Sequence, residues 1–363
     1  MSAERAAAAV RPGRTGPRDF DLLVIGDCNP DVLVLGDDLA PAFGQQEKLV
    51  DSMSLVVGGS ASITAVAAAR LGLRVALVAA IGDDAAGHFM LAELARAGVD
   101  TTVMAVRAQL PTGMTVALSR GDDRAILTAA GAIGTLTTAD VPADLLTRAR
   151  HVHVSSYFLL ERSLGPGLAA LLADARAAGA ATSLDTNWDP AGTWGAGFFP
   201  GVLAQTDLLL PNEAEALRLA GTTTLPEAVA SLTKAGGAIA VKLGARGALY
   251  ANGPQQYLAT PPPIAAVDTT GAGDCFNAGL LAGLLNGFEP ADALALGCAA
   301  GAASTQGIGG TGSSPELTAA LAMARDVTVQ NARGNRLSTV AAVSSGGAAQ
   351  TSSLKISTSM CPV

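Results

Sequence analysis

The sequence predicts an α/β protein in which a doubly wound, mainly parallel sheet is flanked by helices and carries a small β lid. Short, continuously apolar runs alternate with longer Ala- and Leu-rich stretches of helical period, and glycines follow several of these stretches. Strands that are apolar throughout and separated by helices are typical of a parallel sheet covered on both faces. Two segments that depart from this alternation indicate the lid.

The apolar runs predict strands, and the stretches between them predict helices that end at a glycine. The expected strands are Phe20–Ile25, Val75–Ala79, Val152–Val154, Ala181–Leu184, Leu208–Leu210 and Ala238–Val241. The expected helices are Ala61–Leu71, Gly87–Ala97, Leu164–Ala178, Ala214–Leu219 and Pro226–Lys234. The glycines that follow four of them are Gly72, Gly98, Gly179 and Gly221.

The lid is expected from residues 31–57 and 101–128. The first segment contains strand-like pieces around a loop, and the second contains Thr115–Ser119 and Ala125–Leu127, joined by a polar turn with one glycine. Two short β-rich runs around such a turn predict a hairpin. We interpret these pieces as a small β-structure that stands off the main sheet.

The remaining boundaries follow from composition. Residues 1–18 are interpreted as a disordered extension, because their apolar run is too short and too interrupted for a secretory signal. Residues 19–326 form the expected folded domain, and residues 327–363 are interpreted as a low-complexity, disordered tail rich in Ser, Thr, Ala and Gly.

Charge and cysteine content exclude several classes of protein. The net charge of −8 over 363 residues argues against a nucleic-acid partner, which favours basic surfaces. No run of 18 apolar residues occurs, so the sequence predicts no membrane span. The four cysteines form no CxxC pair, which favours a cytoplasmic protein without a disulfide framework.

The most informative stretch is a glycine-rich turn, Gly271–Gly273, that runs directly into an apolar helix. The first N–H groups of a helix have no partner within the helix, and their positive end suits an anion such as a phosphoryl group. Asp274 lies in the first turn beside this anion site. It either caps the helix or takes a proton from a hydroxyl that attacks phosphorus.

An ordered set of motifs over about residues 20–325 resembles the ribokinase-like, or PfkB, carbohydrate kinase family. The C-terminal motif is Asp268-Thr-Thr-Gly-Ala-Gly-Asp274, and the N-terminal motif is Gly58-Gly59-Ser60-Ala61-Ser62. Further pieces follow in the expected order: Gly26–Asp31, Ile81–Asp84, Pro111–Gly113, Asp185–Asn187, Pro211–Glu215 and Lys242–Gly247.

The resemblance implies an ATP-dependent kinase that transfers the γ-phosphoryl group to a hydroxyl of a small polyol, a sugar first and a nucleoside next. It implies that Asp274 is the general base, and that Gly271, Ala272 and Gly273 donate backbone N–H groups to the phosphoryl group. It assigns the acceptor to four residues: Asn29, Asp31, Gly58 and Gly59.

The resemblance also implies binding sites for ATP and metal ions. Asn212 and Glu215 match a motif that orders water around Mg²⁺, and Asp268 and Thr270 resemble positions that hold a monovalent cation such as K⁺ in some members. The expected ATP contacts come from Asn212, Lys242, Gly244, Arg246, Gly247 and Thr270. Members of the family often form homodimers through the lid, which makes a homodimer an expectation here.

Two other functions remain as alternatives to the kinase. The family usually has Asn where this sequence has Ile63, so a non-catalytic sugar or nucleoside sensor on the same fold is an alternative. A dinucleotide-binding oxidoreductase is a weaker alternative, because the first strand is not followed by Gly-x-Gly-x-x-Gly.

Trp188 and Trp194 lie in a loop with proline and glycine and are interpreted as packing residues.

Overall fold

The computed structural model describes residues 18–120, 123–331 and 334–337. The strands are β1 (Phe20–Gly26), β2 (Asn29–Leu35), β3 (Ser52–Gly58), β4 (Val75–Gly82), β5 (Ala105–Arg107), β6 (Met114–Arg120), β7 (Asp123–Ala129), β8 (Ala149–Val154), β9 (Ala181–Leu184), β10 (Leu208–Leu209), β11 (Ala238–Lys242), β12 (Ala248–Asn252), β13 (Gln255–Thr260), β14 (Thr328–Asn331) and β15 (Arg336–Leu337). The α-helices are α1 (Ser60–Arg70), α2 (Ala85–Arg96), α3 (Ala143–Arg148), α4 (Tyr157–Ala177), α5 (Phe199–Leu203), α6 (Glu213–Ala220), α7 (Leu225–Ala235), α8 (Ala272–Leu285), α9 (Pro290–Ser304) and α10 (Leu317–Ala324).

Within the described residues, the main sheet has the order β15-β14-β13-β12-β11-β10-β9-β8-β1-β4-β5. The pairings from β5 to β11 are all parallel, and those from β11 to β15 are antiparallel. The expectation of a doubly wound, mainly parallel sheet is confirmed, with an antiparallel extension at one end. The strand order places β1 between β8 and β4, and such order reversals position ligand sites in open α/β sheets.

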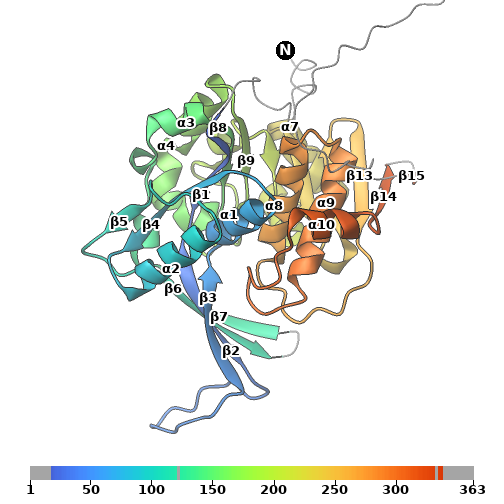
Figure 1. Cartoon of the computed structure of the whole chain (residues 1–363). Helices are drawn as coiled ribbons and strands as arrows, with labels where there is room; N and C mark the ends of the chain where they lie inside the picture. Colours follow the sequence, from blue (N-terminus) through green and yellow to red (C-terminus); the bar gives the residue numbers. More distant parts are fainter. Residues whose placement is uncertain (1–17, 121–122, 332–333, 338–363) are drawn as a thin grey trace, which may run out of the picture.

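Side chains that alternate along the central strands supply two separate hydrophobic layers. Leu22 and Val24 of β1 pack in a layer with α1, α2, α8, α9 and α10, whereas Leu23 and Ile25 pack in the other layer with α3, α4, α5, α6 and α7. Since consecutive side chains of a strand point to opposite faces, an unbroken apolar strand requires helices on both sides. Figure 1 shows the helices of both layers around the sheet.

The second sheet, in the order β3-β2-β6-β7, projects from the main body below α1 and α2 (Figure 1). Strands β6 and β7 pair antiparallel from Met114↔Ala129 to Arg120↔Asp123, which confirms the predicted hairpin. The two turn residues 121 and 122 lie outside the described residues. The sheet is built from the two segments assigned to the lid, and its closing action stays a prediction.

The C-terminal boundary differs from the expectation. The tail was assigned to residues 327–363, but Thr328–Asn331 form β14, which pairs antiparallel with β13, and Val329 is fully buried. A short edge strand can be held by backbone pairing and one buried side chain, and composition gives little sign of either. Residues 338–363 and residues 1–17, which carry the other terminal predictions, lie outside the described residues.

Among the described helices, none is long and apolar enough to cross a membrane.

Three charged side chains tie the starts of β1 and β8 together at the end of the sheet opposite to the strand carboxyl ends. Asp21 accepts hydrogen bonds from Arg74 Nε and Nη2 at 3.0 Å and from Arg150 Nη1 at 3.1 Å. Arg150 also donates to the carbonyl of Leu285, the last residue of α8, at 2.6 Å. Burial alone would raise the pKa of Asp21, but the bonds from both arginines outweigh it and lower the pKa to about 2.

An Asp21→Asn variant is expected to lose stability in a pH-dependent way. Because the folded-state pKa of Asp21 lies below its ordinary value of 3.8, its contribution of about 2 kcal/mol is present above pH 3.8 and is lost as the pH falls toward 2. Urea unfolding at about pH 6 and about pH 3 measures the difference in free energy of unfolding between the two proteins. A difference that stays the same at both pH values would contradict this assignment.

Candidate functional site

Polar and charged side chains gather where several parallel strands end, beside the N-termini of α1 and α8. Asp27 follows β1, Ser155 and Ser156 follow β8, and Asp185 follows β9; all four residues are buried. The carboxyl ends of parallel strands meet at one edge of a sheet, so residues far apart in sequence converge there. This edge is where the glycine-rich turn before α8 also lies, because Asp185 contacts α8 through Asn277.

The turn before α8 presents free backbone donors. Gly271 has a left-handed φ of +72°, and a Cβ there would lie 2.6 Å from the Cα of Gly310, so only glycine fits. Within the described residues, the N–H groups of Gly271, Gly273 and Asp274 have no hydrogen-bond partner. The Ala272 N–H instead donates to the carbonyl of Thr269 at 3.3 Å, so its predicted role as a donor to an anion does not fit this structure.

Asp274 occupies the first turn of α8 with only 8% of its surface exposed. Burial raises the pKa of its carboxyl well above the ordinary value, and the nearby carboxylates of Asp185 and Asp27 raise it further. Lys242 and the Ser60 hydroxyl act in the opposite direction and favour the charged form. A carboxyl with a raised pKa is better suited to accept a proton than an ordinary surface aspartate.

Lys242 lies inside the site rather than on the loop that follows its strand. Its Nζ donates to Asp185 Oδ2 at 2.6 Å, and a Cβ on Gly273 would lie 3.6 Å from the same nitrogen. Burial lowers the pKa of Lys242, but the carboxylates of Asp185, Glu215 and Asp274 raise it by more. Its ammonium group is the buried cation near the start of α8, and its contact with ATP stays a prediction.

The predicted acceptor residues are close together at the base of the second sheet. Asn29 Nδ2 donates to Asp31 Oδ1 at 2.9 Å, and a Cβ on Gly58 would lie 2.0 Å from that same oxygen. Gly59 has a left-handed φ of +79° and a Cβ there would approach Asn29 Oδ1 to 3.0 Å. The two glycines thus leave room for Asp31 and Asn29 beside the start of α1.

Asn212 and Glu215 form a capping box at the start of α6. Asn212 N donates to Glu215 Oε2 at 2.9 Å and its Nδ2 donates to Oε1 at 2.7 Å, while Glu215 N donates to Asn212 Oδ1 at 2.9 Å. Glu215 is buried, and its burial, with the charge of Asp185, raises its pKa to about 7. The pair therefore stabilises the start of α6. An isolated β-bridge between Asn212 and Lys242 keeps the pair next to the buried ammonium group.

The other predicted ATP contacts lie on the turn between β11 and β12. Gly244 and Gly247 both have left-handed φ values, and a Cβ on Gly247 would lie 1.9 Å from the carbonyl oxygen of Ala259. The Arg246 guanidinium pairs with Glu213 at the surface and is 64% exposed. Arg246 is therefore directed toward the start of α6.

Asp268 and Thr270 shape the loop that precedes α8. Asp268 Oδ1 accepts from Thr270 N at 2.9 Å and from Thr270 Oγ1 at 2.7 Å, and Asp268 Oδ2 accepts from Gly309 N at 2.8 Å. These bonds tie the loop to the segment after α9. They hold the Gly271 turn in place and leave the assignment of a cation to these residues as a prediction.

Five residues of the site were given no role by sequence reasoning, namely Asp27, Ser60, Asp185, Asn187 and Asn277. Asp27 caps α1 by accepting from Ser60 N at 3.2 Å and Ala61 N at 2.9 Å, which fixes that helix against β1. Asn187 donates to the Ser60 hydroxyl at 2.7 Å and to the Ser156 hydroxyl at 2.8 Å. Asp27 and Asp185 directly follow apolar strands, which is the signal that could have indicated them.

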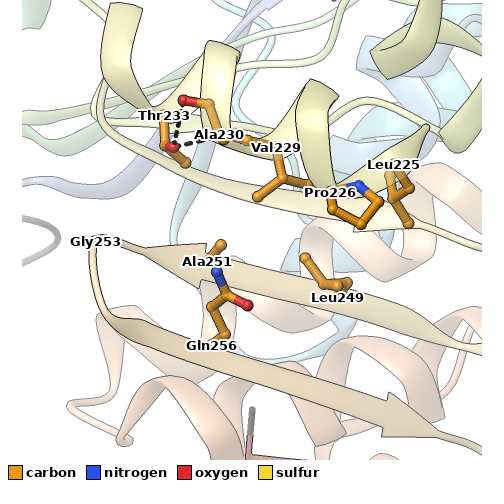
Figure 2. A pocket seen from close by; sticks show the side chains of 9 residues that line it. All are labelled: Leu225, Pro226, Val229, Ala230, Thr233, Leu249, Ala251, Gly253 and Gln256. Carbon is orange, nitrogen blue, oxygen red and sulfur yellow. Dashed lines mark hydrogen bonds between the residues drawn. The ribbon is translucent and has the colours of Figure 1, made fainter. Parts of the chain in front are cut away.

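A cavity of about 360 Å³ lies elsewhere, between α7 and the hairpin of β12 and β13 (Figure 2). Its walls are mainly apolar, from Leu225, Pro226 and Val229 on the helix and Leu249 and Ala251 on the sheet. It contains no charged side chain and none of the predicted site residues. This cavity is therefore separate from the polar and charged residues gathered around Asp274.

Comparison with known proteins identifies the family to which this chain belongs. A model of the pfkB family carbohydrate kinases matches residues 19–317. The 2-dehydro-3-deoxygluconokinase of Bacillus subtilis is 31% identical over 302 residues, which cover 77% of this chain and 90% of that protein. A ribokinase of Haemophilus influenzae is 28% identical and covers 81% of this chain and 95% of its own.

Solved structures agree on the fold. A probable sugar kinase from Rhizobium etli superposes with a TM-score of 0.76 at 25% identity, covering 85% of this chain and 99% of its own. A putative ribokinase II from Escherichia coli, in complex with ATP and Mg²⁺, has a TM-score of 0.75 at 24% identity and covers 84% and 98%.

The fold and the matched motifs thus define a carbohydrate kinase, an enzyme that phosphorylates an alcohol group. This chain belongs to the pfkB family of carbohydrate kinases.

Proposed function

We propose that this kinase transfers the γ-phosphoryl group of MgATP to a hydroxyl of a small sugar, with Asp274 as the general base. The observation that supports this most is the arrangement at α8: a buried carboxyl with a raised pKa beside unpartnered N–H groups of Gly271 and Gly273. Free amides at a helix start fit a phosphoryl group, and the adjacent Lys242 ammonium adds positive charge.

In this mechanism the residues at the start of α8 and the second sheet have separate tasks. MgATP, when bound, supplies the phosphoryl group. Gly271 and Gly273 N–H groups donate to its oxygens, and each such donor contributes roughly 10²–10³ in rate. Asp274 accepts the proton of the attacking hydroxyl, which avoids a build-up of positive charge on the acceptor oxygen. The second sheet, as the predicted lid, would exclude water that competes as a nucleophile.

The acceptor is expected at Asn29, Asp31, Gly58 and Gly59. Asp31 is a buried carboxylate next to an amide, and such a pair can accept and donate hydrogen bonds to several hydroxyls of a polyol. The relatives suggest which sugars to test first, namely 2-dehydro-3-deoxygluconate and ribose. Nucleosides come next, as the family resemblance of the sequence implies.

A sensor function is the second candidate, because Ile63 stands where the family usually has Asn. Ile63 is buried, and a Cβ on Gly310 would lie 2.4 Å from its Cδ1. Its side chain therefore packs against the segment that faces the Gly271 turn and offers the acceptor no polar contact. The free amides beside Asp274 favour the kinase over the sensor.

Two further features belong to the same proposal. Asp268 and Thr270 are proposed as a K⁺ site because oxygen atoms are suitable ligands for this cation, and activity with and without K⁺ would test this.

A homodimer through the second sheet is supported by the exposed apolar side chains of this sheet, among them Met53 at 65% and Leu127 at 64% exposed. Light scattering of the purified protein would measure that assembly.

A screen for ADP release tests the function directly. The protein is incubated with MgATP and pentoses, hexoses, 2-dehydro-3-deoxygluconate or nucleosides, with and without K⁺. The kinase proposal predicts that at least one sugar stimulates ADP release well above the rate without acceptor. Binding of a sugar without any stimulated release would favour the sensor.

The role of Glu215 near Mg²⁺ gives a pH-dependent prediction. Since its pKa is about 7, the carboxylate that would order Mg²⁺-bound water is lost as the pH falls through 7. The Mg²⁺ concentration needed for half-maximal rate should therefore rise below about pH 7, and Glu215→Gln should require the higher concentration at every pH. Glu227→Gln, a change of an exposed acid in the first turn of α7, is the control. Identical Mg²⁺ dependence in the wild type and Glu215→Gln would rule out this role.

A further inference from the structure

We propose that the indole ring of Trp188 is a binding surface for the acceptor, on which the apolar face of the sugar ring stacks. This inference rests on the proposed function of the same site and adds a specificity-determining residue to it. Sequence reasoning interpreted Trp188 as a packing residue, but 57% of its surface is exposed. This exposed ring directly follows Asn187, whose side chain lies in the polar site.

The backbone before Trp188 is anchored to both walls of the site. Asn187 donates to the Ser60 hydroxyl at 2.7 Å and to the Ser156 hydroxyl at 2.8 Å. Ser60 also lies close enough to Asp274 to lower its pKa, and Ser156 does the same for Asp27. Trp188 therefore follows directly a residue that is one side chain away from the proposed base.

The indole packs against other aromatic rings. Trp188 meets Trp194 edge to face, with ring centroids 4.8 Å apart and an interplanar angle of 82°. Trp194 in turn meets Phe158 at 5.7 Å, and Phe158 is buried against Phe199 at 5.8 Å. Trp194 thus packs as expected and holds Trp188 in place, while the rest of the Trp188 ring remains uncovered.

The loop is also fixed by hydrogen bonds around Asp189. Its Oδ1 accepts from Ala191 N at 2.8 Å, and its Oδ2 accepts from Trp194 N at 2.7 Å and Thr193 Oγ1 at 2.9 Å. Asn187 and Trp194 both have left-handed φ values, +52° and +37°, which are costly for residues other than glycine. Backbone strain that is held by neighbouring bonds is typical of functional sites.

A rigid, exposed indole at this position suits a carbohydrate. A sugar ring has a face of C–H groups that favours the electron-rich face of an aromatic ring, whereas its hydroxyls need polar partners such as Asn29 and Asp31. Because the platform is already ordered, stacking on it costs little conformational entropy. The two kinds of contact together would select sugars of a given ring shape.

Steady-state kinetics of Trp188→Ala and Trp188→Phe test the proposal. With ribose and 2-dehydro-3-deoxygluconate as acceptors, Trp188→Ala should raise the acceptor KM by about 10-fold, while the KM for MgATP changes less than about twofold. Trp188→Phe keeps an aromatic face and should recover part of the affinity. Phe198→Ala, which removes a 47% exposed ring farther along the same loop, is the matched control and should leave the acceptor KM unchanged.

Fluorescence separates this proposal from the kinase assignment. Trp188 and Trp194 are the two tryptophans of the chain, so the emission of Trp188→Phe reports Trp194 alone. Titration with the same sugars should change the emission of the wild type and not that of Trp188→Phe. A sugar response without sugar-dependent ADP release would support Trp188 and contradict the kinase. An acceptor KM unchanged in Trp188→Ala, or a wild-type emission unchanged by both sugars, would overturn the role of Trp188.

Discussion

Replacement of Asp274 by Asn is expected to lower kcat by about 10²–10⁴, because an amide cannot accept the proton of the attacking hydroxyl. Asn has nearly the same shape and can keep the contact to Ser60, so the start of α8 should stay intact. The free N–H groups of Gly271 and Gly273 are also unchanged, so MgATP should bind with an affinity within a few-fold of the wild type. Initial rates and a calorimetric titration with MgATP measure the two quantities.

A second acid separates this effect from helix capping. Asp144 lies in the first turn of α3, and its side chain is 65% exposed. Asp144→Asn removes a first-turn charge without touching the site and should leave kcat unchanged. Turnover of Asp274→Asn within threefold of the wild type would show that Asp274 only caps α8.

Replacement of Lys242 by Met is expected to have the largest effect on stability, a loss of about 3–5 kcal/mol in the free energy of unfolding near pH 8. Lys242 is the cation bonded to buried Asp185, and it also faces the carboxylates of Glu215 and Asp274. Without it, these groups repel one another in a site shielded from water. The loss should shrink as the pH falls through 7, where Glu215, with a pKa of about 7, becomes neutral.

The double variant Lys242→Met/Asp185→Asn provides the control for this prediction. Removing the charge of Asp185 together with its partner should restore much of the lost stability, because an uncompensated buried charge is the main penalty. Urea unfolding of the two single variants and the double variant measures the coupling between the residues. Fully additive losses would contradict the view that this pair is coupled.

The sequence predicts the parallel part of the sheet well because each strand there is apolar on both faces. Runs such as Phe20–Ile25 and Val75–Ala79 coincide with β1 and β4. The antiparallel strands β13 and β14 give a weaker signal. In β13 only Ala259 is buried, because one face lies on α9 and the other is open, so the run Gln255–Thr260 reads as polar.

The candidate site is predictable only where a motif lies on contiguous residues. The turn at Gly271 and the position of Asp274 follow from local spacing. The role of Lys242 does not, because its side chain crosses to Asp185, which is 57 residues away in the chain. Such contacts depend on which strands become neighbours in the sheet, and spacing within one motif cannot give that information.

Mass spectrometry of the acceptor after reaction tests the central claim most directly. The wild type and Asp274→Asn are each incubated with MgATP and 2-dehydro-3-deoxygluconate or ribose, and the phosphorylated sugar is quantified. The account predicts that the wild type adds one phosphoryl group to a sugar and that Asp274→Asn forms at least about 10²-fold less of this product in the same time. Equal amounts of sugar phosphate from both proteins, or inorganic phosphate as the sole product of the wild type, would contradict it.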